Sequence, residues 1–154
     1  MLRLRPVPKS VLDAYDGTPE EVTLTGPRRL LRGAGADNNP YGQWWFDEGE
    51  LLSIQSGFDR IPLPASHRRE AILGRLRSNL AISIDWNTLS QWWLMQIPAG
   101  PSVPALVGTI KSQPVFSVAH RLHNPSRSLS GRLRQYWIPV KNPLWVARYG
   151  EVSG

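Results

Sequence analysis

Apolar and polar residues follow two different periods along this chain, and the first half mainly favours helices. The strongest helical pattern begins at Ser66, which we expect to cap the helix, and its apolar positions are Ile72, Leu73, Leu76 and Leu80. A shorter helix is predicted over residues 48–55 with Asp47 as its N-cap. One or two helical turns are predicted over residues 8–15.

Strands are predicted mainly in the second half. Residues 91–97 form a β-prone run that ends at Pro98 and a Gly-Pro turn, whereas residues 126–130 are predicted as a Ser/Arg loop. The other predicted strands are residues 22–24, 28–32, 43–46, 106–111, 133–138 and 144–149. We therefore expect a single α+β domain over residues 1–154, which is long enough to bury a core.

One predicted strand carries a polar residue where a core residue is expected. In SGRLRQYWIPV, residues 130–140, strand alternation places Gln135 on the same side as Leu133 and Trp137. A buried amide without hydrogen-bond partners costs about 1–3 kcal/mol. Gln135 is therefore at an edge position, or is a hydrogen-bonded buried amide, or is the working residue of a site.

Composition removes several classes of protein and site. The chain has no cysteine, which excludes disulfides, thiolate nucleophiles and cysteine metal sites. No apolar run approaches the ~20 residues that span a bilayer, and Pro6 and Pro8 interrupt a basic N-terminal segment without a signal-peptide core. We expect that the protein is made in the cytoplasm and does not associate with a membrane. Export as an effector, without a cleaved signal, is left open. His67 lies among arginines, and His120 and His123 have no carboxylate nearby in sequence, so we expect no metal site.

The net charge of +6 is unevenly distributed. Residues 1–59 carry six Lys/Arg and nine Asp/Glu, a net −3, whereas residues 60–154 carry twelve and three, a net +9. A basic half attracts nucleic acid, dinucleotides or an acidic partner protein, and a solvated basic surface without a partner is an equally good interpretation. Between Trp86 and Gly150 there is no Asp or Glu, which argues against a mechanism that needs two carboxylates from this half.

Tryptophan is abundant, and four of the seven form adjacent pairs, Trp44-Trp45 and Trp92-Trp93. Neighbours on a strand face opposite sides, so both faces of each strand carry a large ring. Such rings are either buried on both sides, which we favour for the second pair, or form a wall that stacks a base or nicotinamide. Near the first pair, Arg32 is predicted at a strand end beside glycines, where its guanidinium can bind a phosphate through two hydrogen bonds. An arginine that simply lies in a turn is the plainer interpretation.

Three segments resemble, in order, the motifs of the ADP-ribosyltransferase-like family: LLRGAG at residues 30–35, GQWWFD at residues 42–47 and SGRLRQYWIP at residues 130–139. In the family these are a strand ending in an NAD-contacting arginine, a strand with an aromatic residue leading into a helix, and a strand with Glu or Gln before an aromatic residue. The NAD-glycohydrolase toxin branch, which includes tuberculosis necrotizing toxin, is the most similar because its third motif carries glutamine.

The resemblance implies split antiparallel sheets with a few flanking helices, and NAD as the substrate. Arg32, beside the bare backbone of Gly33, would hold the NAD pyrophosphate, and Gln135 would contact the nicotinamide ribose at the scissile bond. The aromatic residues at the nicotinamide-ribose end would be Trp44, Trp45 and Phe46, with Tyr136 in support. The implied activity is cleavage of the nicotinamide–ribose bond in a bacterial or phage toxin or effector. The absence of a carboxylate from the third motif argues against transfer of ADP-ribose to protein side chains. It is compatible with hydrolysis of NAD, or with a fold that binds NAD without turning it over.

Two other functions compete with this one. The first is a non-enzymatic domain that binds nucleic acid or a partner protein, with tryptophans as stacking platforms. Its binding residues would be Arg68, Arg69, Arg75, Arg77, Arg132 and Arg134. The second is a structural or immunity-type interaction protein in which the tryptophans lie wholly in the core.

Overall fold

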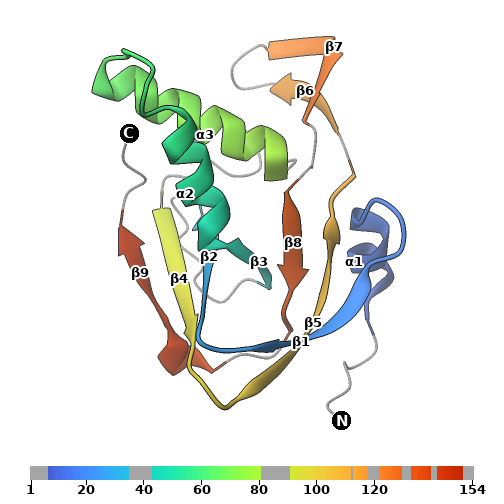
Figure 1. Ribbon diagram of the computed structural model, residues 1–154. Helices are drawn as coiled ribbons and strands as arrows, with labels where there is room; N and C mark the ends of the chain where they lie inside the picture. Colours follow the sequence, from blue (N-terminus) through green and yellow to red (C-terminus); the bar gives the residue numbers. More distant parts are fainter. Residues whose placement is uncertain are drawn as a thin grey trace.

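The protein folds as a curved antiparallel sheet with helices packed against one of its faces (Figure 1). The computed structural model describes residues 7–34, 43–80, 91–111, 113–117, 122–129, 133–139 and 142–150. The helices are α1 (Lys9–Ala14), α2 (Glu48–Gly57), α3 (Ala65–Leu80) and the 3-10 turn η1 (Pro143–Trp145). The strands are β1 (Glu20–Thr25), β2 (Arg28–Ala34), β3 (Trp44–Asp47), β4 (Gln91–Ile97), β5 (Ser102–Thr109), β6 (Gln113–Ser117), β7 (Leu122–Leu129), β8 (Arg134–Trp137) and β9 (Val146–Gly150). The α+β prediction is confirmed.

Seven strands form one sheet in the order β1-β5-β8-β3-β2-β4-β9, and β6 pairs with β7 in a separate hairpin. The described strand pairs are antiparallel. The sheet has two halves, β1-β5-β8 and β2-β4-β9, and the four-residue strand β3 joins them. The register of β3 covers two residue pairs on each side: Leu30–Asp47 and Leu31–Phe46 with β2, Trp44–Trp137 and Trp45–Tyr136 with β8. The seven strands therefore form one continuous antiparallel sheet, with β3 as the link between its halves.

The two halves also meet at one end, where β1 turns into β2 and β4 turns into β5 (Figure 1). In the second turn Gly100 has a φ of 109°, a left-handed conformation that favours glycine. In the first turn, Gly26 packs directly against the β4–β5 turn. A Cβ at this position would overlap the carbonyl oxygens of Ile97 and Pro98. Glycine is required at position 26 because no side-chain atom fits between the two turns.

Alternation along the strands gives the sheet two apolar faces. The inner face, enclosed by the curvature, carries one cluster that reaches from β1 to β4: Leu24, Leu30, Trp45, Met95, Ile97, Val103, Ala105, Val107, Tyr136 and Ile138. The helix face is covered at one end by α2 and α3 over Leu31, Phe46, Trp92, Leu94 and Leu133. At its other end α1 covers Leu106, Ile110 and Trp137. The helix α3 contributes Ile72 and Leu76, whose four-residue spacing puts them on one side of the helix.

The strand β8 follows the predicted alternation. Leu133 and Trp137 pack on the helix face, whereas Tyr136 and Ile138 pack on the inner face. Because β8 lies between β5 and β3, the interpretation of Gln135 as an edge residue is wrong.

Three local predictions differ from the structure. The Ser/Arg loop at residues 126–130 is wrong, because β7 runs through most of this segment and its backbone pairs with β6, which outweighs weak strand propensity. Ser66 does not begin α3, since the helix starts one residue earlier, at Ala65. The predicted strand 144–149 begins later, at Val146, because η1 takes the preceding three residues.

Several features singled out in the sequence lie outside the described residues: Gly35, the loop at residues 36–42, His120, Gly131 and Arg132. For His123 and Arg77 the structure describes the backbone element alone. No described helix is both long and apolar enough to cross a membrane.

We expect Gly26→Ala to lower the free energy of unfolding by more than about 2 kcal/mol, because the two turns would have to separate. Gly74→Ala is the matched control, since a Cβ at Gly74 in α3 meets no atom within 4 Å. That change is expected to stabilise the protein by about 0.5–1 kcal/mol, through the lower chain entropy of alanine in the unfolded state. Urea unfolding measures both effects. A Gly26→Ala variant as stable as the wild type would contradict the contact between the turns.

Candidate functional site

Three segments that are far apart in the sequence become neighbours at the centre of the sheet. Arg32 lies in β2, Trp44 begins β3 and Gln135 lies in β8. The strand β3 pairs with both of the others, so a single strand separates Arg32 from Gln135. The structure thus brings together the three strands that carry the residues proposed from the sequence.

The side chains of these strands are divided between the two faces of the sheet. Residues opposite one another in an antiparallel pair share a face. Trp45 lies opposite Tyr136, and both pack in the inner-face cluster. Arg32 shares the inner face with Leu30, two residues before it, and half-buried Gly33 follows. The inner face therefore holds Arg32, Trp45 and Tyr136, and the helix face holds Trp44, Phe46 and Gln135.

Contacts at the start of β3 connect the two groups. The Arg32 guanidinium donates from Nη1 to the carbonyl oxygen of Trp44 at 3.4 Å, so it lies at the end of β3. The Trp44 ring packs against Tyr15, with ring centroids 5.3 Å apart. The Tyr15 hydroxyl lies 3.2 Å from the carbonyl oxygens of both Gln135 and Leu106. A continuous path of contacts therefore runs from Arg32 to the backbone of Gln135.

Tyr15 is a residue of this region that sequence reasoning missed. Its side chain is 1% exposed, and its backbone forms a bridge with Ile110 that fixes the end of α1 beside β5. The ring lies over Gly108, where an added Cβ would come within 2.9 Å of Cδ1. Burial raises the pKa of the Tyr15 hydroxyl, which therefore stays a donor at neutral pH. The available sequence signal was Gly108, because a glycine inside a strand often marks a close approach.

Gln135 is, among the residues whose burial is described, the one polar residue in the core, with 6% of its surface exposed. Its side chain lies on the helix face between the cluster under α1 and the cluster under α2 and α3. On the other face, burial lowers the pKa of Arg32, whose guanidinium still remains charged at neutral pH. Arg32 and Gln135 therefore lie on nearly adjacent strands but on opposite faces of the sheet, and Gln135 is buried in the core.

Tyr136 faces away from the Gln135 side chain and joins a network with Asp47 and Arg28. Its hydroxyl donates to Asp47 Oδ2 at 2.9 Å and accepts from Arg28 Nη2 at 3.2 Å. Arg28 Nε also donates to Asp47 Oδ1 at 3.1 Å, and its guanidinium carbon lies 5.3 Å from the centre of the Tyr136 ring. Burial, and then the bond to Asp47, raise the pKa of Tyr136. Asp47 stands at the N-cap position of α2, as predicted, but its carboxylate makes no capping hydrogen bond.

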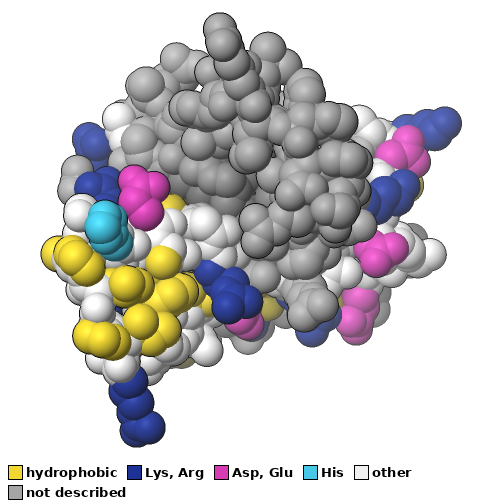
Figure 2. All heavy atoms as spheres, turned by 90° about the horizontal axis from the view of Figure 1, so that it is seen from above, with side chains coloured by type: hydrophobic (Ala, Val, Ile, Leu, Met, Phe, Trp, Pro, Cys, Tyr) yellow, Lys and Arg dark blue, Asp and Glu magenta, His cyan; other side chains and the backbone are white. Residues whose placement is uncertain are grey.

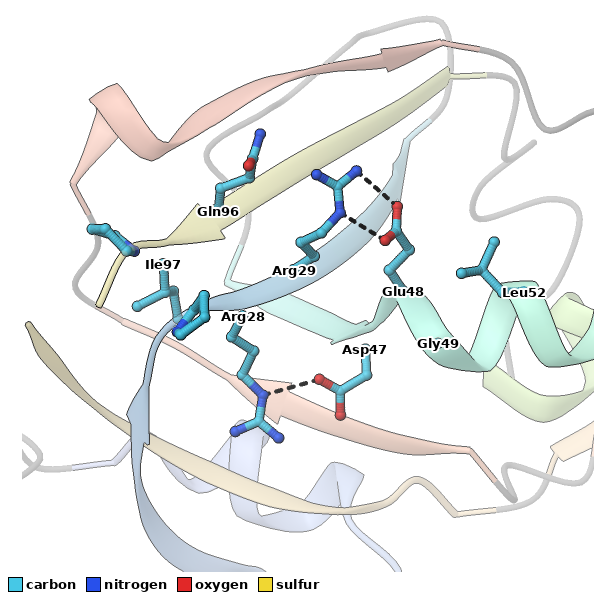
Figure 3. Close-up of a pocket in the computed structure, with 10 residues that line it drawn as sticks. Arg28, Arg29, Asp47, Glu48, Gly49, Leu52, Gln96 and Ile97 are labelled. Carbon is cyan, nitrogen blue, oxygen red and sulfur yellow. Dashed lines mark hydrogen bonds and ion pairs between the residues drawn. The ribbon is translucent and has the colours of Figure 1, made fainter. Parts of the chain in front are cut away.

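A cavity of about 570 Å³ opens between the start of α2, the start of β2 and the end of β4 (Figure 3). Two ion pairs border it, Arg28 with Asp47 and Arg29 with Glu48. Its apolar lining consists of Pro27, Leu52, Ile97 and Pro98. Each arginine already binds a carboxylate, so the lining is balanced in charge and has little attraction for a phosphate. The adjacent Arg-Arg and Asp-Glu dipeptides were the sequence signal for this arrangement.

The Arg29–Glu48 pair ties α2 to the sheet. Nε and Nη2 of Arg29 donate to the two carboxylate oxygens of Glu48 at 2.7 and 3.0 Å. These bonds, with a further one from Tyr149, lower the pKa of Glu48 below its ordinary value. The pair therefore stabilises the fold at neutral pH, where Glu48 is ionised.

The basic half of the chain is partly neutralised by acids from the first half. Arg68 pairs with Asp59, and a guanidinium nitrogen of Arg134 lies 3.6 Å from Glu20. Binding of nucleic acid or an acidic protein through this half stays a prediction. Figure 2 shows hydrophobic side chains gathered on the face seen from above. The exposed large apolar residues in α2 and the α2–α3 connection are Leu52, Ile61 and Leu63.

No family model and no curated protein matches the chain. Among solved structures it is similar to "Rhs1-CT in complex with cognate immunity protein RhsI1", with 9% sequence identity and a TM-score of 0.48. The match covers 89% of this chain and 81% of that chain. A likeness of this size carries no argument about function. Within the described ranges, no cluster of His, Cys, Asp or Glu could hold a metal ion.

We expect Glu48→Gln to destabilise the protein by about 0.5–1 kcal/mol near neutral pH, because it removes the ion pair with Arg29. The pKa of Glu48 is lowered in the folded state, so this stabilisation is complete above its ordinary pKa of 4.5 and is lost as the pH falls through the folded value. Unfolding in urea near pH 7 and near pH 3 should therefore show a difference that disappears in acid. Glu50→Gln, in the same exposed first turn, controls for the charge at the helix start. A difference that persists at low pH would contradict the assignment.

Proposed function

We propose that this chain cleaves the nicotinamide–ribose bond of NAD and acts as a bacterial or phage toxin or effector. One observation carries the proposal. The three segments that resemble the family motifs lie on the adjacent strands β2, β3 and β8, although most of the chain separates the first from the third. Nothing in the sequence alone required these strands to be neighbours, so their adjacency supports a common site.

Arg32 is the residue proposed to hold the diphosphate of NAD. Its guanidinium lies at the end of β3, where it donates to the Trp44 carbonyl and keeps its charge. Trp44 is half-buried at the same strand end, so part of its ring is available to the nicotinamide ribose. Arg32 and Gln135 lie on opposite faces, and Gln135 lies further along β3 than its start, level with Phe46, so an extended dinucleotide would have to cross β3 to reach both.

Gln135 is proposed to contact the nicotinamide ribose at the bond that breaks. Cleavage of this bond develops positive charge on the ribose, and nicotinamide leaves readily without a general acid. The amide oxygen of Gln135 is proposed to stabilise the developing charge. As the bond to nicotinamide breaks, one water molecule forms the new bond to the ribose carbon and its proton is released to solvent. The strand β8 carries no carboxylate, so no residue on it can activate a protein acceptor as a general base. Hydrolysis to ADP-ribose and nicotinamide is therefore favoured over transfer to a protein side chain.

We expect the purified protein to release nicotinamide from NAD, and Gln135→Ala to lower the rate at least about a hundredfold, because it removes a contact made to the transition state. Arg32→Ala is expected to raise KM, since it removes binding of the diphosphate. Chromatography of released nicotinamide and of ADP-ribose measures both. Gln96→Ala and Arg75→Ala are matched controls, because both residues are exposed and lie away from the three strands' shared region. A wild type that releases no nicotinamide, and whose melting temperature NAD does not raise, contradicts the proposal.

A further inference from the structure

Two buried polar atoms near the start of β4 have no hydrogen-bond partner in the described part of the chain. They are the amide oxygen of Gln91 and the indole nitrogen of Trp93. A buried polar atom without a partner costs about 1–3 kcal/mol, and each such atom in a native fold calls for an explanation. One atom accepts and the other donates, so a ligand that satisfies both carries an acceptor and a hydrogen-bond donor.

Strand register places Trp93 between two arginines, at a point where the pairing of β4 with β9 shifts register between Trp92 and Trp93. Trp93 lies opposite Arg32 of β2 on one side and opposite Arg148 of β9 on the other. Side chains opposed in this way have Cβ atoms about 5 Å apart. Gln91, opposite Ala34, is two residues from Trp93 and shares the inner face with it. Trp93 therefore lies between the strand positions of the two arginines, while the Arg32 guanidinium itself reaches the Trp44 carbonyl. The glutamine lies one row further along the strands.

The charge around this row favours an anion. Residues 87–149 contain no Asp or Glu. Arg148 is exposed, and no carboxylate among the described residues pairs with it. In contrast, the two arginines of the α2 cavity are matched by two carboxylates. Neighbouring positions on β2, β4 and β9 thus carry two arginines and two unsatisfied polar atoms.

We propose that Gln91, Trp93 and Arg148 complete, around Arg32, a binding site for a diphosphate linked to a sugar. The guanidinium groups bind phosphate oxygens, and the Trp93 indole N–H donates to one of them. The Gln91 amide oxygen accepts a hydrogen bond from a sugar hydroxyl. The inference rests on the proposed function, because NAD has this chemistry, and it extends that function to three residues outside the motif segments. It concerns binding alone, so it can be tested without turnover.

The test is calorimetric titration of ADP-ribose and of inorganic pyrophosphate into the wild type, Trp93→Phe and Gln91→Leu. Trp93→Phe keeps an aromatic ring and removes the donor, so both affinities should fall about tenfold. Gln91→Leu removes the acceptor for the sugar, so ADP-ribose affinity should fall about tenfold while pyrophosphate affinity stays unchanged. Trp145→Phe and Gln96→Leu are matched controls that should bind both probes like the wild type. Arg148→Gln should weaken both probes and reduce the dependence of their binding on salt.

The outcomes separate this inference from the proposed function. Wild-type affinity for ADP-ribose in both Trp93→Phe and Gln91→Leu overturns the site, as does a wild type that binds neither probe. If both variants release nicotinamide with an unchanged KM, the proposed diphosphate–sugar site is rejected and the catalytic proposal is kept. If the wild type releases no nicotinamide but the variants lose ADP-ribose affinity as expected, the catalytic proposal is rejected and the diphosphate–sugar site is kept.

Discussion

The short strand β3 is the constraint on which the rest of the structure depends. Its backbone must satisfy partners on both edges, because it is the link between β2 in one half of the sheet and β8 in the other. Its side chains alternate between faces, so Phe46 packs under α2 and α3 while Trp45 packs in the inner-face cluster. The last residue, Asp47, binds Arg28 and Tyr136 from the two flanking strands. The four residues of β3 therefore link the two halves of the sheet, contribute side chains to the apolar clusters on both faces, and complete one polar network.

The sequence alone was sufficient for the elements whose own pattern decides their structure. The spacing of Ile72 and Leu76 indicated α3, and the alternation in residues 133–138 separated the inner face from the helix face before any pairing was known. The hairpin of β6 and β7 escaped prediction because its strand state comes from pairing rather than from the Ser and Arg residues of β7. Asp47 has the sequence position of an N-cap, but its carboxylate bonds to Arg28 and Tyr136, which are distant in sequence, instead of to the start of α2.

The candidate site was only partly predictable for a related reason. Local motifs named Arg32, Trp44 and Gln135, but no local pattern says which face of a sheet a residue shares with another strand. That depends on register, which divides these residues between two faces. Register also places Trp93 opposite Arg32, a relation between β2 and β4 that periodicity within either strand does not contain. Tyr15 reaches the site from α1, outside every motif segment.

The bond between the Tyr15 hydroxyl and the Gln135 carbonyl joins groups 120 residues apart. This separation has a consequence for synthesis. The centre of the sheet needs β8, so a ribosome must translate nearly the whole described chain before α1 has its final partner and β3 has its second neighbour. Contacts of such long sequence range also form late and slowly in folding. A partly synthesised chain therefore lacks the assembled centre of the sheet. The contacts among β2, β3 and β8 form only after β8 has been translated.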